Sequence, residues 1–272
     1  MADAAYLTTM SRAFDPLIRP VFDEAIRSLG LPRGSRGLDV GCGIGLQAMM
    51  LGEAVGSKGR ITGLDLSAGS LECAKALVRD AGLTGRVTFR EGDAAALPFD
   101  DGIFDWAWSA DCVGYATAID PVGAVREMAR VVRPGGWVIL FSWSSERLLP
   151  GFPELEARLG ATTAGLAPFA RGLPPERHYL RALGWLRDVG LREPAVRTFV
   201  RDVHAPLGSD IRQALVGLFE MRWPDVEAEL APEDRLLFRR LCDPASAEFI
   251  VDHPDYAAWF TCTMFSAAKA GG

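Results

Sequence analysis

The order of apolar runs and amphipathic segments predicts a doubly wound α/β fold, with helices on both faces of a parallel sheet. Short apolar runs alternate with helical patterns over the first 145 residues. This alternation buries each strand between two layers of helices, and right-handed crossovers then determine the winding. A glycine-rich turn, Gly41-Cys42-Gly43-Ile44-Gly45, lies between the first expected strand and the next helix.

The expected strands are short and apolar, and turn residues bound them. They are 37–40, 60–66, 86–91, 104–109, 137–143, 195–203 and 255–268. Helices are expected where apolar residues recur every three or four positions. They are 46–55, 71–81, 121–132 and a helix from Pro174-Pro175 to about 190. Gly135-Gly136 is expected to break the helix before the fifth strand.

The expected domain organisation has four parts. They are an N-terminal helical cap segment at 1–30, the cofactor-binding core at 31–207, a helical insertion at 208–254, and the last strand of the core at 255–272. Pro224 and Pro232 divide the insertion into helical segments. Most of its apolar residues are expected to form a small core, and a few to face the sheet as a hydrophobic lid.

Composition narrows the class of protein. The 272 residues are 49% hydrophobic and 24% charged, which is enough to bury a large core. The net charge of -6 disfavours a nucleic-acid partner. Five widely spaced cysteines without a C-x-x-C pair argue against a disulfide framework and against a zinc site, so no metal is expected. The sequence shows no signal or membrane-spanning pattern, and a cytoplasmic setting is expected.

The glycine turn is a candidate ligand cradle. Glycines permit positive φ and a close backbone approach, but a G-x-G pattern alone also occurs in plain tight turns. Asp65 ends the second strand, where it could accept hydrogen bonds from ribose hydroxyls or cap the helix near Ser67. Asp93 ends the third strand and could accept from an adenine amino group or serve as a turn aspartate.

The spacing of the glycines bears on the cofactor class. A dinucleotide motif usually places two residues between its second and third glycines, whereas one residue separates Gly43 from Gly45. Asp39 precedes the first glycine by two positions. A carboxylate there suits an amine or sulfonium better than a pyrophosphate. The pattern therefore favours a positively charged methionyl cofactor and disfavours NAD.

Five motifs in order resemble class I S-adenosylmethionine (SAM)-dependent methyltransferases, in the small-molecule branch related to ubiquinone and menaquinone biosynthesis. They are Leu38-Asp39-Val40-Gly41-Cys42-Gly43-Ile44-Gly45, Gly63-Leu64-Asp65-Leu66-Ser67, Gly92-Asp93-Ala94-Ala95-Ala96-Leu97-Pro98-Phe99, Phe104-Asp105 and Arg130-Val131-Val132-Arg133-Pro134-Gly135-Gly136. The resemblance covers roughly residues 30–145.

The resemblance implies a Rossmann-like, seven-stranded sheet with a reversed last strand, SAM as cofactor and S-adenosylhomocysteine (SAH) as product. It implies that the glycine turn holds the methionyl part, Asp65 the ribose, and Asp93 with Ala94 the adenine, while Ser109 lies near the methionyl moiety. The full set of expected cofactor residues is Asp39, Gly41, Cys42, Gly43, Gly45, Asp65, Leu66, Asp93, Ala94 and Ser109.

Methyl transfer needs a nucleophile in line with the methyl carbon, and a base only if that nucleophile carries a proton. The leaving thioether is neutral, so no acid is required. Five candidate bases follow or precede strands at the expected ligand face, and one or none of them acts. They are His204, His178, His253, Asp111 and Tyr115.

The expected substrate is a largely apolar small molecule, methylated at O, N or C and belonging to secondary metabolism or to quinone-like precursors. Two alternatives stay open: a SAM-using enzyme of the same fold with decarboxylase or cyclase chemistry, and a non-catalytic SAM-binding partner. The sequence leaves the oligomeric state open, with a homodimer as one option.

Overall fold

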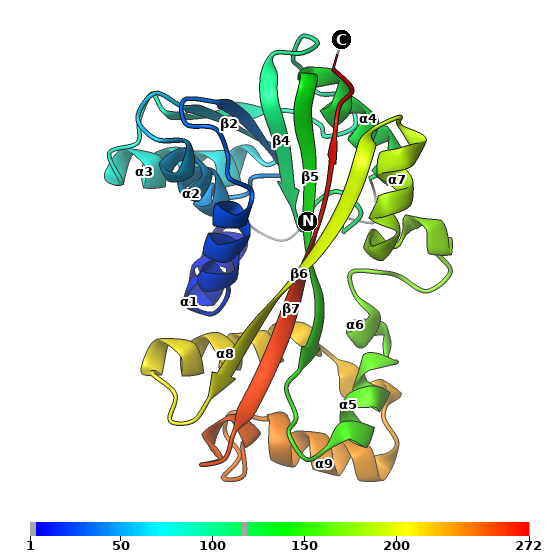
Figure 1. Ribbon diagram of the computed structural model, residues 1–272. Coiled ribbons are helices and arrows are strands. Elements are labelled where there is room, and N and C mark those ends of the chain that lie inside the picture. Colours follow the sequence, from blue (N-terminus) through cyan, green and yellow to red (C-terminus); the bar gives the residue numbers. More distant parts are fainter. Residues whose placement is uncertain (1–3, 116–118, 272) are drawn as a thin grey trace.

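In the computed structural model, which describes residues 4–115 and 119–271, seven strands form one sheet in the order β3-β2-β1-β4-β5-β7-β6 (Figure 1). The strands are β1 Arg36–Val40, β2 Arg60–Asp65, β3 Val87–Glu91, β4 Phe104–Ala110, β5 Val132–Arg147, β6 Arg192–His204 and β7 Ala257–Ala268. The first five strands pair in parallel, and β7 runs antiparallel to both β5 and β6. The expected doubly wound fold with a reversed last strand is confirmed.

Helices lie on both faces of the sheet and beyond one end of it. The α-helices are α1 Ala4–Ser28, α2 Leu46–Val55, α3 Ala68–Asp80, α4 Pro121–Val131, α5 Pro153–Gly160, α6 Thr163–Leu166, α7 Ala182–Asp188, α8 Ser209–Arg222 and α9 Pro232–Cys242. Short 3-10 helices are η1 Pro175–Arg177, η2 Tyr179–Arg181, η3 Val226–Glu229 and η4 Ile250–Asp252. No helix among the described residues is long and apolar enough to cross a bilayer.

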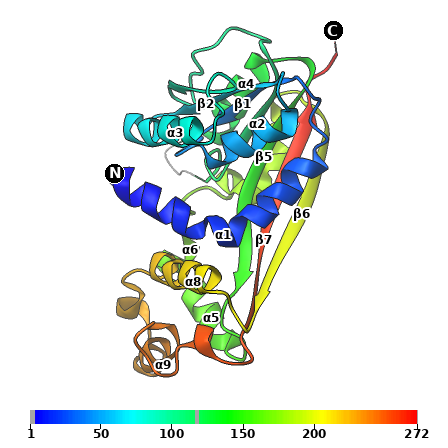
Figure 2. The same cartoon turned by 90° about the vertical axis from the view of Figure 1, so that its left-hand side faces the viewer.

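Two apolar clusters hold the layers together. The tryptophans Trp106 and Trp108 of β4 point to the face covered by α1 and α2, whereas Ala107 between them faces α4 and α7. This alternation is the two-residue period of a strand buried on both sides. Figure 2 shows α1 crossing in front of the sheet with a bend; Pro16 and Pro20 lie inside this helix, and an internal proline removes a backbone hydrogen bond.

The strands β5, β6 and β7 extend well beyond the rest of the sheet, toward α5, α8 and α9 (Figure 1). β5 was expected at 137–143, but it spans Val132–Arg147 because its extra length pairs with β7 down to Arg147 and Trp259. Gly135-Gly136 does not separate helix from strand: α4 ends at Val131 and the glycines lie inside β5. A Cβ on Gly136 would come within 2.3 Å of the Asp105 carbonyl oxygen, so the glycine permits this close strand contact.

Other sequence expectations need smaller corrections. The helix expected from Pro174 is replaced by η1 and η2, and only Ala182–Asp188 is α-helical. His178 joins the two turns, since its backbone N–H bonds to Pro175 and its ring accepts from Leu180. The segment 208–254 falls between β6 and β7 as helices α8, η3, α9 and η4. The sequence predicts a helix and a loop over the sheet edge at 151–175; the helices α5 and α6 form in this segment, at the end of the molecule where α8 and α9 lie (Figure 1).

Candidate active site

The glycine turn is packed on two sides and open on the third. Gly41, Gly43 and Gly45 all have positive φ, at 77°, 51° and 79°. A Cβ on Gly41 would lie 2.4 Å from the Cys112 Sγ, and one on Gly45 would lie 2.7 Å from the Phe89 ring. A Cβ on Gly43 would meet no atom within 4 Å. Gly43 therefore presents bare backbone to open space.

Asp65 links the glycine turn to the start of α3. Its Oδ2 accepts a 2.8 Å hydrogen bond from the Gly43 N–H, and its Oδ1 accepts a 2.9 Å bond from the Ser67 N–H. The side chain of the neighbouring Leu66 is 63% exposed, which leaves an apolar surface beside the carboxylate. Each carboxylate oxygen keeps acceptor capacity for a ligand hydroxyl, so the turn-capping and ribose-binding roles are compatible.

Asp39, near the end of β1, is a buried carboxyl group beside the glycine turn. Its side chain is 1% exposed, and its Oδ2 has no hydrogen-bond partner among the described residues. Burial, and secondarily the charge of Asp65, raise the pKa of Asp39 to about 8. A buried carboxylate without a partner is costly, so a cation placed here would be stabilised.

The other expected cofactor residues lie at the ends of β3 and β4. The Asp93 Oδ1 accepts a 2.8 Å bond from the Ala95 N–H, as a turn aspartate does, and the residue is exposed. Ala94 is buried. Ser109 is 2% exposed, and its Oγ accepts a 3.3 Å bond from the Val113 N–H, which shapes the loop after β4.

Asp111 opens onto a cavity of about 230 Å³. It has the unusual φ of 47°, and its Oδ1 accepts a 2.8 Å bond from the Trp143 N–H. Oδ2 has no protein hydrogen bond in the described part of the chain. Burial raises the pKa of Asp111 to about 6. The cavity is lined by Phe14, Ile18, Asp111, Tyr115, Trp143, Glu146, Leu218, Met221 and Arg222.

A second cavity of about 210 Å³ adjoins the first. The two share four lining residues, Tyr115, Trp143, Glu146 and Arg222. The remaining lining residues of the second cavity are Ser144, Gly165, Leu166, Ala167, Pro168, Phe169, His178 and Tyr179. We call the first cavity the Asp111 lobe and the second the His178 lobe.

An ion pair at the boundary between the lobes joins α8 to β5. The Arg222 Nε donates to one oxygen of Glu146, and the Trp143 Nε1 donates to the other. The Arg222 Nη1 donates a 2.8 Å bond to the Ala167 carbonyl. The side chain of Glu146 is 8% exposed and that of Arg222 is 22% exposed. This network ties together the rim of the sheet, the loop after α6 and the end of α8.

Of the three histidines, His178 lies at the cavities. Its ring stacks on Tyr179 with centroids 4.4 Å apart, and burial lowers its pKa. Its Nδ1 accepts a 3.2 Å bond from the Leu180 N–H. The neutral ring then carries its proton on Nε2, so in this arrangement His178 is a hydrogen-bond donor and not a base.

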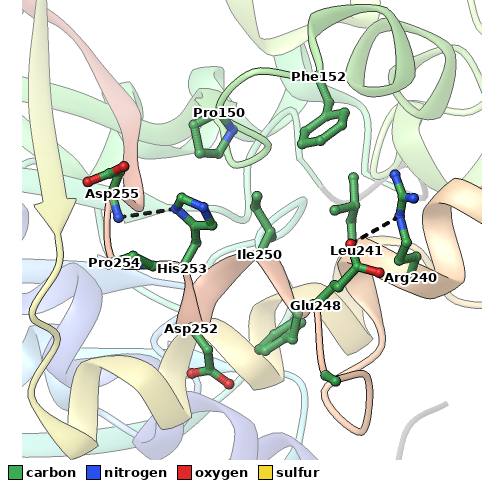
Figure 3. Close-up of a pocket in the computed structure, with 12 residues that line it drawn as sticks. Pro150, Phe152, Arg240, Leu241, Glu248, Ile250, Asp252, His253, Pro254 and Asp255 are labelled. Carbon is green, nitrogen blue, oxygen red and sulfur yellow. Dashed lines mark hydrogen bonds and ion pairs between the residues drawn. The ribbon is translucent and has the colours of Figure 1, made fainter.

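His204 and His253 lie elsewhere. His204 is the last residue of β6, is exposed, and pairs with Ala257 beyond the end of β5. His253 lines a separate cavity of about 490 Å³, which shares no lining residue with the two lobes. Figure 3 shows it near Pro150, with its ring accepting from the Asp255 N–H. The expectation that all three histidines face one site is therefore corrected for these two.

Sequence reasoning missed two charged residues of the site. Glu146 and Arg222 are 76 positions apart and neither belongs to a local motif. Phe14 and Ile18 of α1 were also missed as individual wall residues, although the N-terminal helix was expected to help to close the site. The apolar run of β5 ends at Phe141 and serines follow it, so no local pattern indicated that the strand continues to Glu146.

Part of the chain matches a known protein family. Residues 38–140 match the family model described as "Methyltransferase domain". Demethylmenaquinone methyltransferase of Staphylococcus epidermidis is 39% identical over 132 residues, which is 48% of this chain and 52% of that protein. The Bacillus subtilis protein of the same name is 28% identical over 197 residues, covering 67% of this chain and 82% of that protein. The chain thus spans about half the length of the Staphylococcus relatives that it matches.

A solved structure supports the fold. Geranyl diphosphate methyltransferase in complex with SAM superposes with a TM-score of 0.54 at 17% identity, covering 99% of this chain and 92% of that one. Residues 38–140 are a class I SAM-dependent methyltransferase domain. The two relatives above share the name demethylmenaquinone methyltransferase, and a methyltransferase domain of this class takes SAM as its cofactor.

Proposed function

We propose that the protein transfers the methyl group of SAM to a nucleophile of a largely apolar small molecule bound in the Asp111 lobe. The observation that carries this proposal is Asp111, which lines a mostly apolar cavity and whose Oδ2 has no hydrogen bond to another described residue. Its proximity to the glycine turn follows from the chain itself, because the next residue, Cys112, packs on Gly41. The lobe thus lies next to the cradle that would hold the cofactor.

The residues of the cradle fit SAM. Bare backbone at Gly43, exposed Leu66 and the acceptor oxygens of Asp65 can hold the adenosyl part. Asp39, whose buried Oδ2 has no partner in the described part of the chain, suits the positive charge of the methionyl part. When bound, SAM supplies an electrophilic methyl group on a sulfonium.

Asp111 is the proposed base. With a pKa near 6 it is mostly ionised at neutral pH, and its Oδ2 can accept a proton from an acceptor O–H or N–H. On a hydroxyl-bearing ring, removal of that proton also raises electron density at ring carbon, so C-methylation remains open. Tyr115 and His178 are proposed to orient the acceptor as donors, and His204 and His253 have no role in this reaction.

The helical segment 208–254 is proposed to act as a lid on the core of 31–207, closed on its other side by the cap segment 1–30. Leu218 and Met221 of α8, with Phe14 and Ile18 of α1, form the apolar wall of the lobe. Closing such a wall excludes water, which strengthens the electrostatic interactions inside. The relatives are named for methylation of demethylmenaquinone, so a quinone-like molecule is the first acceptor to test.

The experiment has two stages. Calorimetry with SAM and with SAH tests the cradle, and saturable binding of both is expected. Incubation with SAM and a panel of hydroxyl- and amine-bearing aromatic metabolites then follows SAH release and product mass. A gain of one methyl group with equimolar SAH supports the proposal. Turnover of an acceptor without SAH release indicates the decarboxylase or cyclase alternative, and absence of cofactor binding overturns the assignment.

A further inference from the structure

Arg222 occupies an unusual place in the cavity, since it lines both lobes and belongs to the lid. Its Nε and Nη1 are used by Glu146 and by the Ala167 carbonyl. Its Nη2 has no hydrogen-bond partner among the described residues, and the side chain keeps 22% of its surface exposed. One planar donor of the guanidinium therefore remains available at the boundary between the lobes.

The same guanidinium faces the polar groups of the acceptor site. The charges of Asp111 and Arg222 both act on the Tyr115 hydroxyl, with opposite effects on its pKa, which burial raises overall. Tyr179 is affected similarly: Asp111 raises its pKa and Arg222 lowers it. The Tyr179 hydroxyl donates a 2.9 Å bond to the Ser144 carbonyl. Asp111, Tyr115 and Arg222 all line the Asp111 lobe, so an acceptor bound there meets a carboxylate, a hydroxyl and a guanidinium in one cavity.

Glu146 keeps Arg222 in this position. Both oxygens of Glu146 are occupied, one by the Arg222 Nε and one by the Trp143 Nε1. A planar guanidinium held through Nε and Nη1 cannot rotate without breaking both bonds, so the direction of Nη2 is set before a ligand enters. Such preorganisation lowers the entropy cost of recognition.

We propose that Arg222 determines acceptor specificity: the acceptor carries, beside its nucleophilic group, an oxygen that accepts a hydrogen bond from Arg222, as a carbonyl or a carboxylate does. The nucleophilic group faces Asp111 and the apolar remainder occupies the two lobes. This inference rests on the proposed function and adds the chemical class of the substrate.

Three elongated probes test it: 4-phenylphenol, its 2-acetyl derivative and its 2-carboxy derivative, in which the added oxygen lies next to the hydroxyl group. Binding is measured by calorimetry to the protein saturated with SAH, so that no turnover is needed. The wild type is expected to bind at least one of the two oxygen-bearing probes about tenfold or more tightly than 4-phenylphenol. The acetyl and carboxy arms show whether a neutral carbonyl suffices or a carboxylate is required.

The test variant must remove the Arg222 donor without leaving a buried charge unpaired. Arg222→Met alone would leave the buried Glu146 charge without its partner, which destabilises the site for an unrelated reason. The double variant Arg222→Met/Glu146→Gln removes both charges and keeps their volumes. It is expected to bind 4-phenylphenol and SAH as the wild type does, while the preference for the oxygen-bearing probe falls below about threefold.

A matched control lies on the same helix. Arg212 pairs with Asp252 through two 2.6 Å bonds, and neither lines a lobe. The variant Arg212→Met/Asp252→Asn is expected to retain the full oxygen preference. The inference is overturned if the Arg222/Glu146 variant keeps that preference, or if the SAH-loaded wild type binds none of the probes or binds all three equally. Failure of SAH to bind would instead overturn the proposed function.

Discussion

The two ends of the site are built in different ways. At the proposed cofactor end, the groups that would contact SAM are the backbone of 41–45 and the carboxylates of Asp39 and Asp65, and short local motifs supply them. At the proposed acceptor end, side chains come from six parts of the chain: α1, the loop after β4, β5, the segment at α6 and after it, the segment before α7, and α8. Because backbone at strand tips is dictated by the fold, one cradle can serve many acceptors, whereas the acceptor wall can change residue by residue.

The largest effect is expected from a substitution that disturbs the backbone of the glycine turn. Gly41→Val places a Cβ 2.4 Å from the Cys112 Sγ at a φ of 77°. We expect the loss of measurable SAH binding and a decrease of about 3 kcal/mol in the free energy of unfolding, from overpacking and strain. Urea titration and calorimetry measure the two effects.

Gly30→Ala is the control for that change. Gly30 also has a positive φ, 57°, but a Cβ there meets no atom within 4 Å. It should cost about 1 kcal/mol and leave SAH affinity unchanged. Equal losses in both variants would mean that the contact with Cys112 has no special importance.

The next effect concerns the acceptor end. Asp111→Asn should lower kcat about 10²–10⁴-fold while leaving SAH affinity intact, because the amide cannot take a proton but can still accept from the Trp143 N–H. In the wild type, kcat/KM should rise with pH and level off above about 6, where the Asp111 carboxyl is ionised. Persistence of this rise in the variant would show that another group titrates.

A smaller effect tests the ribose assignment at the cofactor end. Asp65→Ala should weaken SAM and SAH binding by about 1–3 kcal/mol, the scale of a lost charge-assisted hydrogen bond. Since Asp65 also holds Gly43, the comparison is repeated with the 2′-deoxy derivative of SAH. The wild type should bind the 2′-deoxy derivative more weakly than SAH, whereas the Asp65→Ala variant should bind the two compounds with similar affinity. Unchanged calorimetric affinity in Asp65→Ala contradicts the assignment.

The smallest expected effect concerns Asp39 and pH. Its pKa is raised from 3.8 in the unfolded chain to about 8 in the folded protein, so the folded state holds the extra proton between these values. Its contribution to stability is therefore complete below pH 4 and declines as pH rises toward 8. The Asp39→Asn variant should lack this decline. Its free energy of unfolding, relative to that of the wild type, should therefore be higher at pH 8.5 than at pH 5 by at least about 1 kcal/mol.

The measurement is the difference between the urea-unfolding free energies of wild type and variant at several pH values. Asp111 titrates in the same direction but is present in both proteins, so the difference isolates Asp39. A bound sulfonium should lower the pKa of Asp39, so SAM should gain affinity over SAH as pH rises from 6 to 9 in the wild type alone. Parallel pH curves for the two proteins would assign the buried proton elsewhere.

The residues of the proposed cofactor end could be predicted because their sequence motifs are local. Gly41, Gly43 and Gly45 occupy a strand-to-helix turn, and Asp65 follows the next strand, as the spacing indicated. The acceptor end was only partly predictable. Asp111 and Tyr115 follow β4 and line the same cavity, as their position in the sequence suggested. His253 was grouped with them on topology alone, and it lines a separate cavity at the end of the molecule to which β5, β6 and β7 extend.

The sequence by itself determined the order of strands and helices, the glycine cradle and the carboxylates at the strand tips, since each depends on hydrophobic period and backbone geometry within a few residues. Only the tertiary structure decided that Glu146 pairs with Arg222 and that the Nδ1 of His178 accepts a backbone N–H. It also decided that one oxygen of Asp111 has no hydrogen bond to another described residue. Those outcomes depend on how far β5 continues and where α8 packs. Both are results of long-range burial, which no short stretch of residues encodes.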